Sequence, residues 1–387
     1  MIKLARISSV LLEYQSPSSM KQQDENKELI NALVQVSRAL IAVSILFAVC
    51  VAIVIFTLLT PAGHKFADTP KQASAKPNQM AIVPSTEASA GTTPRRVPAD
   101  AWKAPEESTI PVGKAGDAIR YGRELIAHTA QYFGPKGSVA MITNGMNCQN
   151  CHLAGGTKIF GNDYAGFISS YPKMSGRSGK VEPASERIAE CFERSLAGKV
   201  PDTAGKEVQA ILAYMKWIGK DVKKGQKLFG SATEKIAFMD HAADPEKGKE
   251  VFVMKCQSCH GSNGEGLLNA DQKTYANPPL WGKHSYNDGA GMYRLTNLAG
   301  FVKNNMPFGA TYQSPQLTDE EAWNVAAFIN TQPRPHKDQH KDWTNLKKKP
   351  IDFPFGPYAD GFSEKQHKLG PFKPIKDAQK ELTSKKS

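Results

Sequence analysis

The chain has 387 residues, a formal net charge of +12 at pH 7, and 40% hydrophobic residues. This length is enough for two compact domains with extensions, and six cysteines are too few for a disulfide scaffold. The positive charge comes without an aromatic and basic reading module, so it does not indicate a nucleic-acid partner.

The first predicted element is a membrane anchor. Residues 39–59, ALIAVSILFAVCVAIVIFTLL, carry no charge and include Cys50, which we expect to be a small apolar membrane residue. As a helix with a rise of ~1.5 Å per residue they would span roughly 31 Å, the thickness of a bilayer's hydrocarbon core. The polar segment 1–38 precedes this run, which is longer than the apolar region of a cleavable signal. Basic residues precede the run (Lys3, Arg6, Lys21, Lys27 and Arg38) and predict a cytoplasmic N-terminus.

A linker and three further segments are expected after the anchor. Residues 60–110 are rich in Pro, Ala and Ser and predict a flexible tether. Two domains follow at 111–230 and 240–335. Residues 336–387 form a basic C-terminal extension, which we expect to run as an extended strap over the domains with a frayed end. The chain beyond the anchor would then be periplasmic and held at the inner membrane by a single helix.

Each predicted domain contains one C-x-x-C-H motif, the pattern of c-type haem attachment. The first is Cys148, Cys151 and His152, and the second is formed by the residues that match them (Cys256, Cys259 and His260). Two thiols on one turn can each form a thioether to the same porphyrin, and the adjacent imidazole reaches the iron. The sequence therefore predicts two covalently bound haem c groups. Zinc binding and dithiol exchange are the alternatives.

The surroundings of the two motifs repeat. Each motif is preceded by a helical opening, IRYGRELI at 119–126 and PEKGKEVF at 245–252, and is followed at a distance by an apolar helix, at 205–219 and 318–332. This order is that of a small class I cytochrome c domain. We therefore predict an all-α fold of two tandem class I cytochrome c domains after the transmembrane helix and the linker.

The repeat also predicts the sixth iron ligands. Met306 stands before a proline, 46 residues after His260, and is the expected ligand of the second iron. At the corresponding place in the first domain, 39 residues after His152, stands Cys191, and Met174 is the other candidate. An isolated cysteine is more commonly a small buried hydrophobe, and this alternative stays open for Cys191.

The segment around Cys191 predicts a helix over 186–197, with Ser185 as N-cap and Gly198 as stop. Helical spacing places Arg187, Cys191 and Ser195 on one face with Arg194 beside them, while Glu190 and Glu193 point away. Guanidinium groups match oxyanions and hold a thiol ionised. The face is therefore suited to a small sulfur or oxygen dianion.

Three stretches resemble the dihaem cytochrome c thiosulfate dehydrogenases, which interconvert thiosulfate and tetrathionate. They are YPKMSGRSGKVEPASERIAECFERSLAGK, KNNMPFG and FPFGPYADGFSEKQHKLGPF, within residues 110–375. The resemblance implies that Cys191 is the distal ligand of the first haem and the sulfur that handles substrate, and that Arg177, Arg187 and Ser195 line the anion site. Some members carry lysine directly before the second methionine. This chain has Asn305 there, with Lys303 nearby.

The expected function is therefore interconversion of thiosulfate and tetrathionate at the first haem. Electrons would pass to or from the second haem and an external redox partner, which could be a small cytochrome, an oxidase or a quinone-linked donor or acceptor. The alternatives are a membrane-anchored dihaem electron carrier without substrate chemistry and another sulfur-oxidising cytochrome. A dihaem peroxidase fits less well, because both domains offer a sixth ligand.

Overall fold

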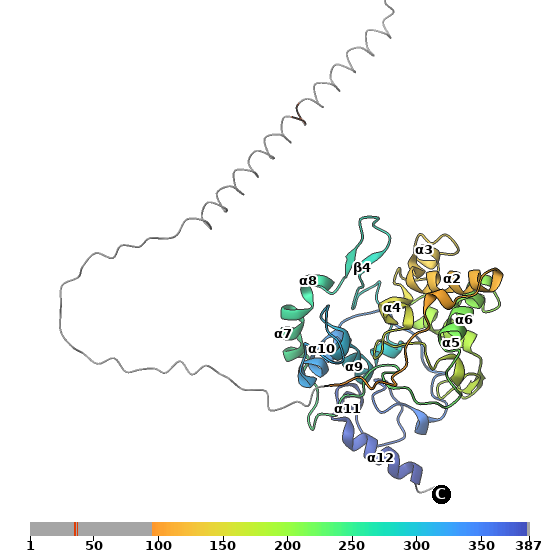
Figure 1. Cartoon of the computed structure of the whole chain (residues 1–387). Coiled ribbons are helices and arrows are strands. Elements are labelled where there is room, and N and C mark those ends of the chain that lie inside the picture. The colour runs from red at the N-terminus through yellow and green to blue at the C-terminus, as the bar shows by residue number, and fades with distance from the viewer. Residues whose placement is uncertain (1–34, 36, 38–94, 385–387) are drawn as a thin grey trace, which may run out of the picture. The chain divides into compact units, whose positions relative to one another are not determined.

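The structure is a computed structural model that describes residues 35, 37 and 95–384 (Figure 1). The predicted anchor at 39–59, nearly all of the segment 1–38 and most of the linker 60–110 lie outside these residues. Among the described residues, no helix is both long and apolar enough to span a bilayer. The description below concerns 95–384.

The first half is built on two crossed helices, α2 (Lys114–Ala127) and α6 (Lys206–Ile218). The sequence predicts the second of these at 205–219, and the structure agrees to within one residue at each end. Gly122 lies at the crossing, where a Cβ would stand 2.0 Å from the carbonyl oxygen of Ala210. Only a glycine permits this approach. The buried side chains around the crossing include Leu125, Ile211 and Tyr214.

The second half repeats this arrangement with α7 (Pro245–Lys255) and α10 (Asp319–Thr331). A Cβ on Gly248 would stand 1.9 Å from the carbonyl oxygen of Asn324. Each helix starts at a side-chain cap: the Asp244 carboxylate accepts backbone N–H groups before α7, and Thr318 forms a capping box before α10. Figure 1 shows one crossed pair in each half of the described chain.

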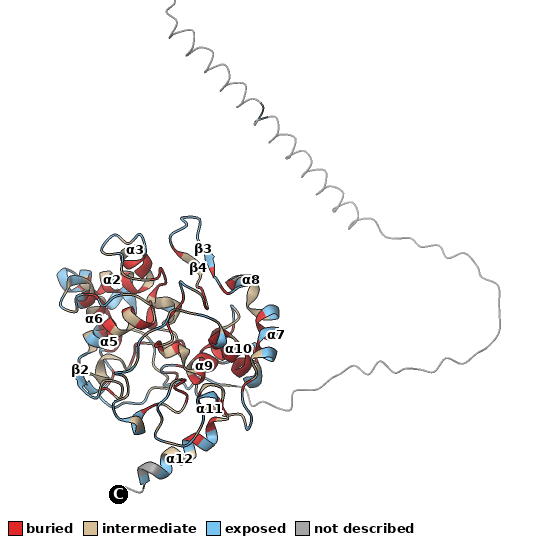
Figure 2. Cartoon of the chain, turned by 180° about the vertical axis from the view of Figure 1, so that it is seen from behind, coloured by how far each residue is buried: buried red, intermediate tan, exposed pale blue. Residues whose placement is uncertain are grey.

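Helix α5 (Ala184–Arg194) carries Cys191 and packs its Ile188 and Phe192 into the first core. It begins after Pro183, not Ser185, and ends before the predicted boundary. Figure 2 shows buried residues on α5 and α6, and most densely on α9 (Leu295–Asn305) and α10.

The residue with positive φ after α5 is Ala197, at 42°, while the N–H of Gly198 donates to Phe192 O at 3.0 Å. The sequence predicted that Gly198 ends the helix, but a glycine is needed at this position because the backbone of another segment lies close to it. A Cβ there would stand 2.0 Å from the carbonyl oxygen of Ile142.

The sequence predicted an all-α fold, but the described residues also contain two short antiparallel hairpins, so the fold is mostly helical. β1 (Lys173–Met174) pairs with β2 (Val181–Glu182), and β3 (Leu267–Leu268) pairs with β4 (Tyr275–Asn277). The remaining short elements are the helices α3 (Thr129–Phe133), α4 (Leu153–Gly156), α8 (Gln257–His260) and α11 (Glu364–Leu369), and the 3₁₀ turns η1 (Glu107–Thr109), η2 (Cys148–Asn150), η3 (Ile168–Ser170), η4 (Gly291–Tyr293) and η5 (Leu346–Lys348).

The C-terminal extension is not simply an extended strap. It contains α11 and ends in α12 (Phe372–Ser384). Phe372 and Ile375, three residues apart on α12, are 3% and 1% exposed and belong to the second core. This i,i+3 apolar pair makes α12 an amphipathic helix that the second core can bury.

Hydrogen bonds join the two halves. Asn144 Nδ2 donates to Ser285 O at 3.0 Å, and at the end of α5 Asn287 donates from Nδ2 to Glu193 O at 2.9 Å and from its backbone N–H to Arg194 O at 3.1 Å. These bonds fix the end of α5 against the second half, and with it the segment that carries Cys191.

Candidate active site

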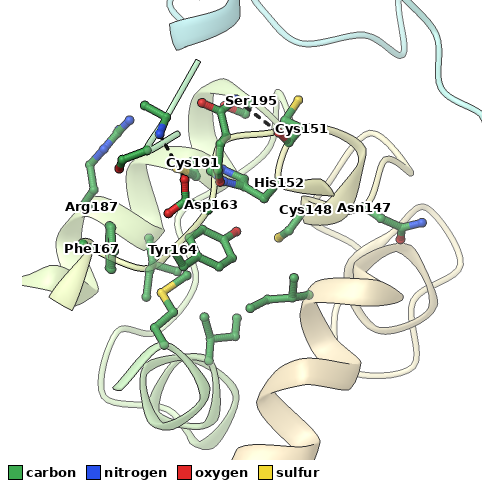
Figure 3. Close-up of a pocket in the computed structure, with 18 of the residues that line it drawn as sticks. Asn147, Cys148, Cys151, His152, Asp163, Tyr164, Phe167, Arg187, Cys191 and Ser195 are labelled. Carbon is green, nitrogen blue, oxygen red and sulfur yellow. Dashed lines mark hydrogen bonds between the residues drawn. The ribbon is translucent and has the colours of Figure 1, made fainter. Parts of the chain in front are cut away.

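The first C-x-x-C-H motif lies on η2 and the turn after it, at a cavity of about 490 Å³ (Figure 3). Cys148, Cys151 and His152 line this cavity. Cys191 and Ser195, at the C-terminal end of α5, line the same cavity. The structure thus brings the first motif together with the cysteine that stands 39 residues further along the chain.

Both motif histidines are held by backbone carbonyls. His152 Nδ1 lies 2.6 Å from Asn162 O, and His260 Nδ1 lies 2.8 Å from Pro278 O. Since a carbonyl only accepts, Nδ1 must carry the proton and donate, which leaves Nε2 with its lone pair for a metal. Burial lowers the pKa of His152 to about 4, so its imidazole is neutral at pH 7.

The second motif lines a separate cavity of about 170 Å³. Cys256, Cys259 and His260 lie there together with Met306, the residue that follows α9. Met146 and Cys151 of the first half line both cavities. The two motifs therefore lie at adjacent cavities that share part of their lining.

Two polar side chains that precede Met306 on α9, Lys303 and Asn305, form hydrogen bonds with residues of other segments. Lys303, 7% exposed, donates from Nζ to Leu317 O at 2.6 Å and pairs with Asp319 at 2.8 Å. Asn305 Nδ2 donates to Phe160 O at 3.0 Å, which links α9 to the first half. In this structure Met306 lines the second cavity and Lys303 is bound to α10 and the residue before its cap.

The predicted anion residues divide between two adjoining spaces. Arg187 and Ser195 line the first cavity with Cys191, as expected. Arg177 lies instead in a neighbouring pocket of about 390 Å³, together with Glu190. Arg187 lines both spaces and joins them.

Glu190 corrects one expectation. It does not point away from Arg187: its Oε2 accepts from Arg187 Nη1 at 2.7 Å and from Arg177 Nη1 at 3.0 Å. Arg187 and Glu190 are three residues apart on α5, so the helix itself brings them together. Burial opposes the charge on Glu190, but the two arginines outweigh it and lower the pKa of this carboxyl. The negative charge of a Cys191 thiolate raises the pKa of Arg187 above its usual range.

Arg194 corrects a second expectation. Its guanidinium turns away from the first cavity and binds Asp342 of the C-terminal extension through two bonds of 2.8 and 2.9 Å. The Arg194 side chain is only 7% exposed. Sequence reasoning missed Asp342 because the partners lie 148 residues apart and no local pattern relates them.

Met174, the other candidate for the first iron, lies on β1 and is 55% exposed. It lines the pocket of Arg177, whereas Cys191 lines the cavity of the first motif. Of the two candidates, Cys191 therefore lines the cavity of the first motif and Met174 does not.

These observations fit a covalently bound haem. Each cavity offers two thiols, a neutral imidazole oriented by a carbonyl, a sulfur from a distant segment, and a largely apolar lining. The fold and the site thus define a c-type cytochrome. The family model for Cytochrome c matches residues 245–333.

Similarity to characterised proteins identifies the family. The chain is 37% identical over 281 residues to the thiosulfate dehydrogenase of Psychrobacter arcticus, covering 72% of this chain and 82% of that protein. It is 35% identical over 242 residues to the thiosulfate dehydrogenase of Allochromatium vinosum, covering 62% and 86%. The chain belongs to the thiosulfate dehydrogenase family, as its sequence motifs predicted, and it is a haem c enzyme.

A solved structure is also similar. The thiosulfate dehydrogenase TsdBA from Marichromatium purpuratum aligns with a TM-score of 0.58 and 29% identity, over 67% of this chain. The present chain spans about half of that protein, 54% of its length.

Proposed function

We propose that this protein oxidises thiosulfate to tetrathionate at a haem held by His152 and Cys191. The observation that carries the proposal is the shared cavity: the first haem-attachment motif, Cys191, Arg187 and Ser195 all line it. A thiolate there can ligate iron and attack sulfur, and a guanidinium beside it stabilises both the thiolate and a bound anion. The thiosulfate dehydrogenases among the relatives support this substrate.

Two haem groups have residues to hold them. Cys148 and Cys151 would carry the first and Cys256 and Cys259 the second, with His152 and Cys191 on one iron and His260 and Met306 on the other. When bound, the haems supply one-electron acceptors. Thiolate ligation lowers a haem potential and thioether ligation raises it, which favours transfer from the first site to the second. The shared lining by Met146 and Cys151 supports such a relay.

The chemistry of the side chains balances as follows. The Cys191 thiolate forms a sulfur–sulfur bond with the outer sulfur of one thiosulfate, and the two electrons released by this oxidation pass to the external redox partner as the final acceptor. The outer sulfur of a second thiosulfate then attacks the sulfur that came from the first one. The bond to Cys191 breaks, tetrathionate departs, and the thiolate is restored. Arg187, which lines both spaces, binds the sulfonate oxygens, and Ser195 donates a hydrogen bond from its hydroxyl.

The reverse reaction uses the same groups. Tetrathionate presents a sulfur–sulfur bond to the same thiolate, and two electrons supplied from outside complete the reduction. Both directions are therefore to be measured with each variant.

Replacement of Cys191 tests the proposal. We expect purified, haem-loaded Cys191→Ser and Cys191→Gly to lose thiosulfate-dependent reduction of ferricyanide, and tetrathionate reduction with a reduced viologen, by at least about a hundredfold, since removing a nucleophile removes the covalent route. The thiolate signature of the oxidised first haem should vanish from the electron paramagnetic resonance spectrum. Turnover that survives in both variants would refute the mechanism.

Met174→Leu is the matched ligand control. Because Met174 lies outside the first cavity, we expect its removal to leave the thiolate signature and the visible spectrum unchanged. If the spectrum of Met174→Leu changed while the spectra of the Cys191 variants stayed like that of wild type, Met174 would be the distal ligand of the first haem.

The place of action is a further part of the proposal. We propose that the uncharged run 39–59 anchors the haem-binding part in the periplasm, where a small cytochrome, an oxidase or a quinone-linked protein exchanges electrons with it. One relative of part of the chain, 26% identical over 144 residues, is a cbb3-type cytochrome c oxidase subunit of Azospirillum brasilense. Cell fractionation tests the anchor: the full chain should sediment with inner membranes, and a chain that keeps an export signal but lacks 39–59 should not.

A further inference from the structure

Through Asp342, the C-terminal extension reaches Arg177, which lines the pocket of about 390 Å³ described above and here called the anion pocket. The carboxylate lies between the buried Arg194 and the partly buried Arg177: it binds Arg194 through two hydrogen bonds, and its Oδ2 lies 3.6 Å from Arg177 Nε. The Asp342 side chain is 10% exposed and that of Arg177 is 15% exposed. Two guanidiniums this close would repel each other in a poorly solvated site, and the carboxylate between them removes that cost.

Trp343 adds a second contact to the same arginine. Its backbone N–H donates to Arg177 O at 2.7 Å, and its ring centre lies 5.8 Å from the Arg177 guanidinium carbon. Its φ of +61° is rare for a bulky residue and places the indole in the wall of the pocket. Phe353 packs against this ring edge-to-face at 5.6 Å and fixes it to the extension.

The arginines and carboxylates form one chain of ion pairs. It runs from Arg187 through Glu190 to Arg177, and from there through Asp342 to Arg194. The set carries one net positive charge, and three of its members, Arg187, Glu190 and Arg177, line the anion pocket. Arg177 Nε is buried and makes no hydrogen bond among the described residues, although Asp342 Oδ2 stands within an ångström of bonding distance.

We propose that Asp342 is a positioning residue of this enzyme, through which the C-terminal extension holds Arg177 in place for a dianionic substrate. The inference rests on the proposed function of the site. Asp342 itself lines neither the first cavity nor the pocket of Arg177. It neutralises Arg194, draws Arg177 Nε toward itself, and so leaves the Nη side of Arg177 for Glu190 and the pocket. Without the carboxylate, Arg194 repels Arg177 and becomes a competing anion partner.

The test compares Asp342→Asn and Asp342→Glu with wild type as full-length, haem-loaded protein. Asn keeps the shape and loses the charge, so we expect the KM for thiosulfate to rise about tenfold while kcat changes less than about threefold. Glu keeps the charge, so the KM of Asp342→Glu should lie between those of wild type and Asp342→Asn. Calorimetric titration of thiosulfate into the same variants in a Cys191→Ser background should show the same loss of affinity without turnover.

Asp360→Asn is the matched control. Asp360 belongs to the same extension, and its side chain, 14% exposed, has Oδ1 3.0 Å from Nε2 of the buried His367. Neither residue lines the first cavity or the pocket of Arg177. We expect this variant to lower the melting temperature while leaving the KM and the calorimetric affinity for thiosulfate unchanged. A purely structural role of Asp342 would give that same pattern.

The outcomes separate cleanly. An unchanged KM and affinity in Asp342→Asn, with or without a lower melting temperature, overturns the positioning role. If wild type binds but does not turn over thiosulfate, the proposed function fails while the affinity comparison still decides the role of Asp342. If Asp342→Asn does not fold, Asp342→Glu decides. Its longer side chain moves the carboxylate relative to Arg177 Nε, so we expect a weaker affinity for thiosulfate than in wild type; an affinity equal to that of wild type would show that the position of the carboxylate does not matter and would overturn the inference.

Discussion

At the scale of single residues, Arg187 is the side chain on which the site depends most. It is one helical turn from Cys191 and lines both the first cavity and the anion pocket. Its guanidinium and that of Arg177 both donate to Glu190 Oε2. The charge of a Cys191 thiolate raises the pKa of the Arg187 guanidinium above its usual range. In the proposed function, Arg187 would therefore connect the iron ligand Cys191 with the bound anion.

Substitution of Arg187 separates charge from geometry. Arg187→Gln should lower kcat/KM for thiosulfate about a hundredfold, because hydrogen bonds to charged groups contribute about 1.5–3 kcal/mol. Arg187→Lys keeps the positive charge but lacks the planar guanidinium with its paired N–H donors, and we expect kcat/KM for thiosulfate to fall about tenfold. Steady-state kinetics measure both. Arg123→Gln, which removes an exposed pair with Glu107, is the control that should leave kcat/KM unchanged.

At the scale of elements, the same helix crossing occurs in both halves. Gly122 of α2 meets the backbone of α6, and Gly248 of α7 meets the backbone of α10, each at a distance no Cβ could occupy. The second motif directly follows α7, and the first lies against the end of α2, where Gln149 Nε2 donates to Ala127 O at 2.7 Å. In each half the later helix helps to line the cavity of the motif. Loss of close packing at a crossing would therefore also change the lining of the cavity beside the motif.

Alanine at either crossing tests this packing. Gly122→Ala and Gly248→Ala should each lower the free energy of unfolding by about 1–3 kcal/mol, as overpacked cores do. Guanidinium unfolding followed by haem absorbance measures the change. Gly361→Ala is the control, since a Cβ there meets no atom within 4 Å, and it should change stability by less than about 0.5 kcal/mol. Wild-type stability in the crossing variants would show that the helices can move apart freely.

At the scale of the whole molecule, the C-terminal extension ties both halves together. Asp352, 1% exposed, binds Arg294 at 2.8 Å and the Thr296 hydroxyl at 2.7 Å, beside and within α9 of the second half. Asp342 binds α5 of the first half through Arg194. Burial opposes the charge on Asp352, but Arg294 and Thr296 outweigh it and hold its pKa below the usual range.

Acid unfolding tests the Asp352 contact. Its folded-state pKa is lowered, so its contribution to stability is present above the unfolded value of about 4 and is lost as the pH falls toward the folded value. Asp352→Asn should destabilise the protein by about 3–5 kcal/mol at pH 7, because Arg294 is left without its partner.

The melting temperature of the haem-loaded protein, recorded from about pH 2 to pH 7, measures both effects. The variant should show a shallower acid dependence than wild type. Exposed Asp221→Asn is the surface control and should follow the wild-type curve. Parallel curves for Asp352→Asn and wild type would contradict the assignment.

The amino-acid sequence by itself determined the parts of this protein that depend on local spacing. Two C-x-x-C-H motifs predicted haem c, helical periodicity placed α6 and α10, and the stretch around Cys191 identified the family. These features need only a few consecutive residues, because thioether attachment and helix formation are local. The same local reasoning put Glu190 on the wrong side and left Arg194 beside the thiol.

Only the tertiary structure decided which charges share the site. The pairing of Arg194 with Asp342 spans 148 residues, and the sharing of Met146 and Cys151 between two cavities requires both halves to be packed together. An ion pair of this kind forms only after the extension has packed against the core, so no periodicity or spacing in the chain encodes it. For that reason Cys191 could be found from the sequence, whereas the contact that orients Arg177 could not.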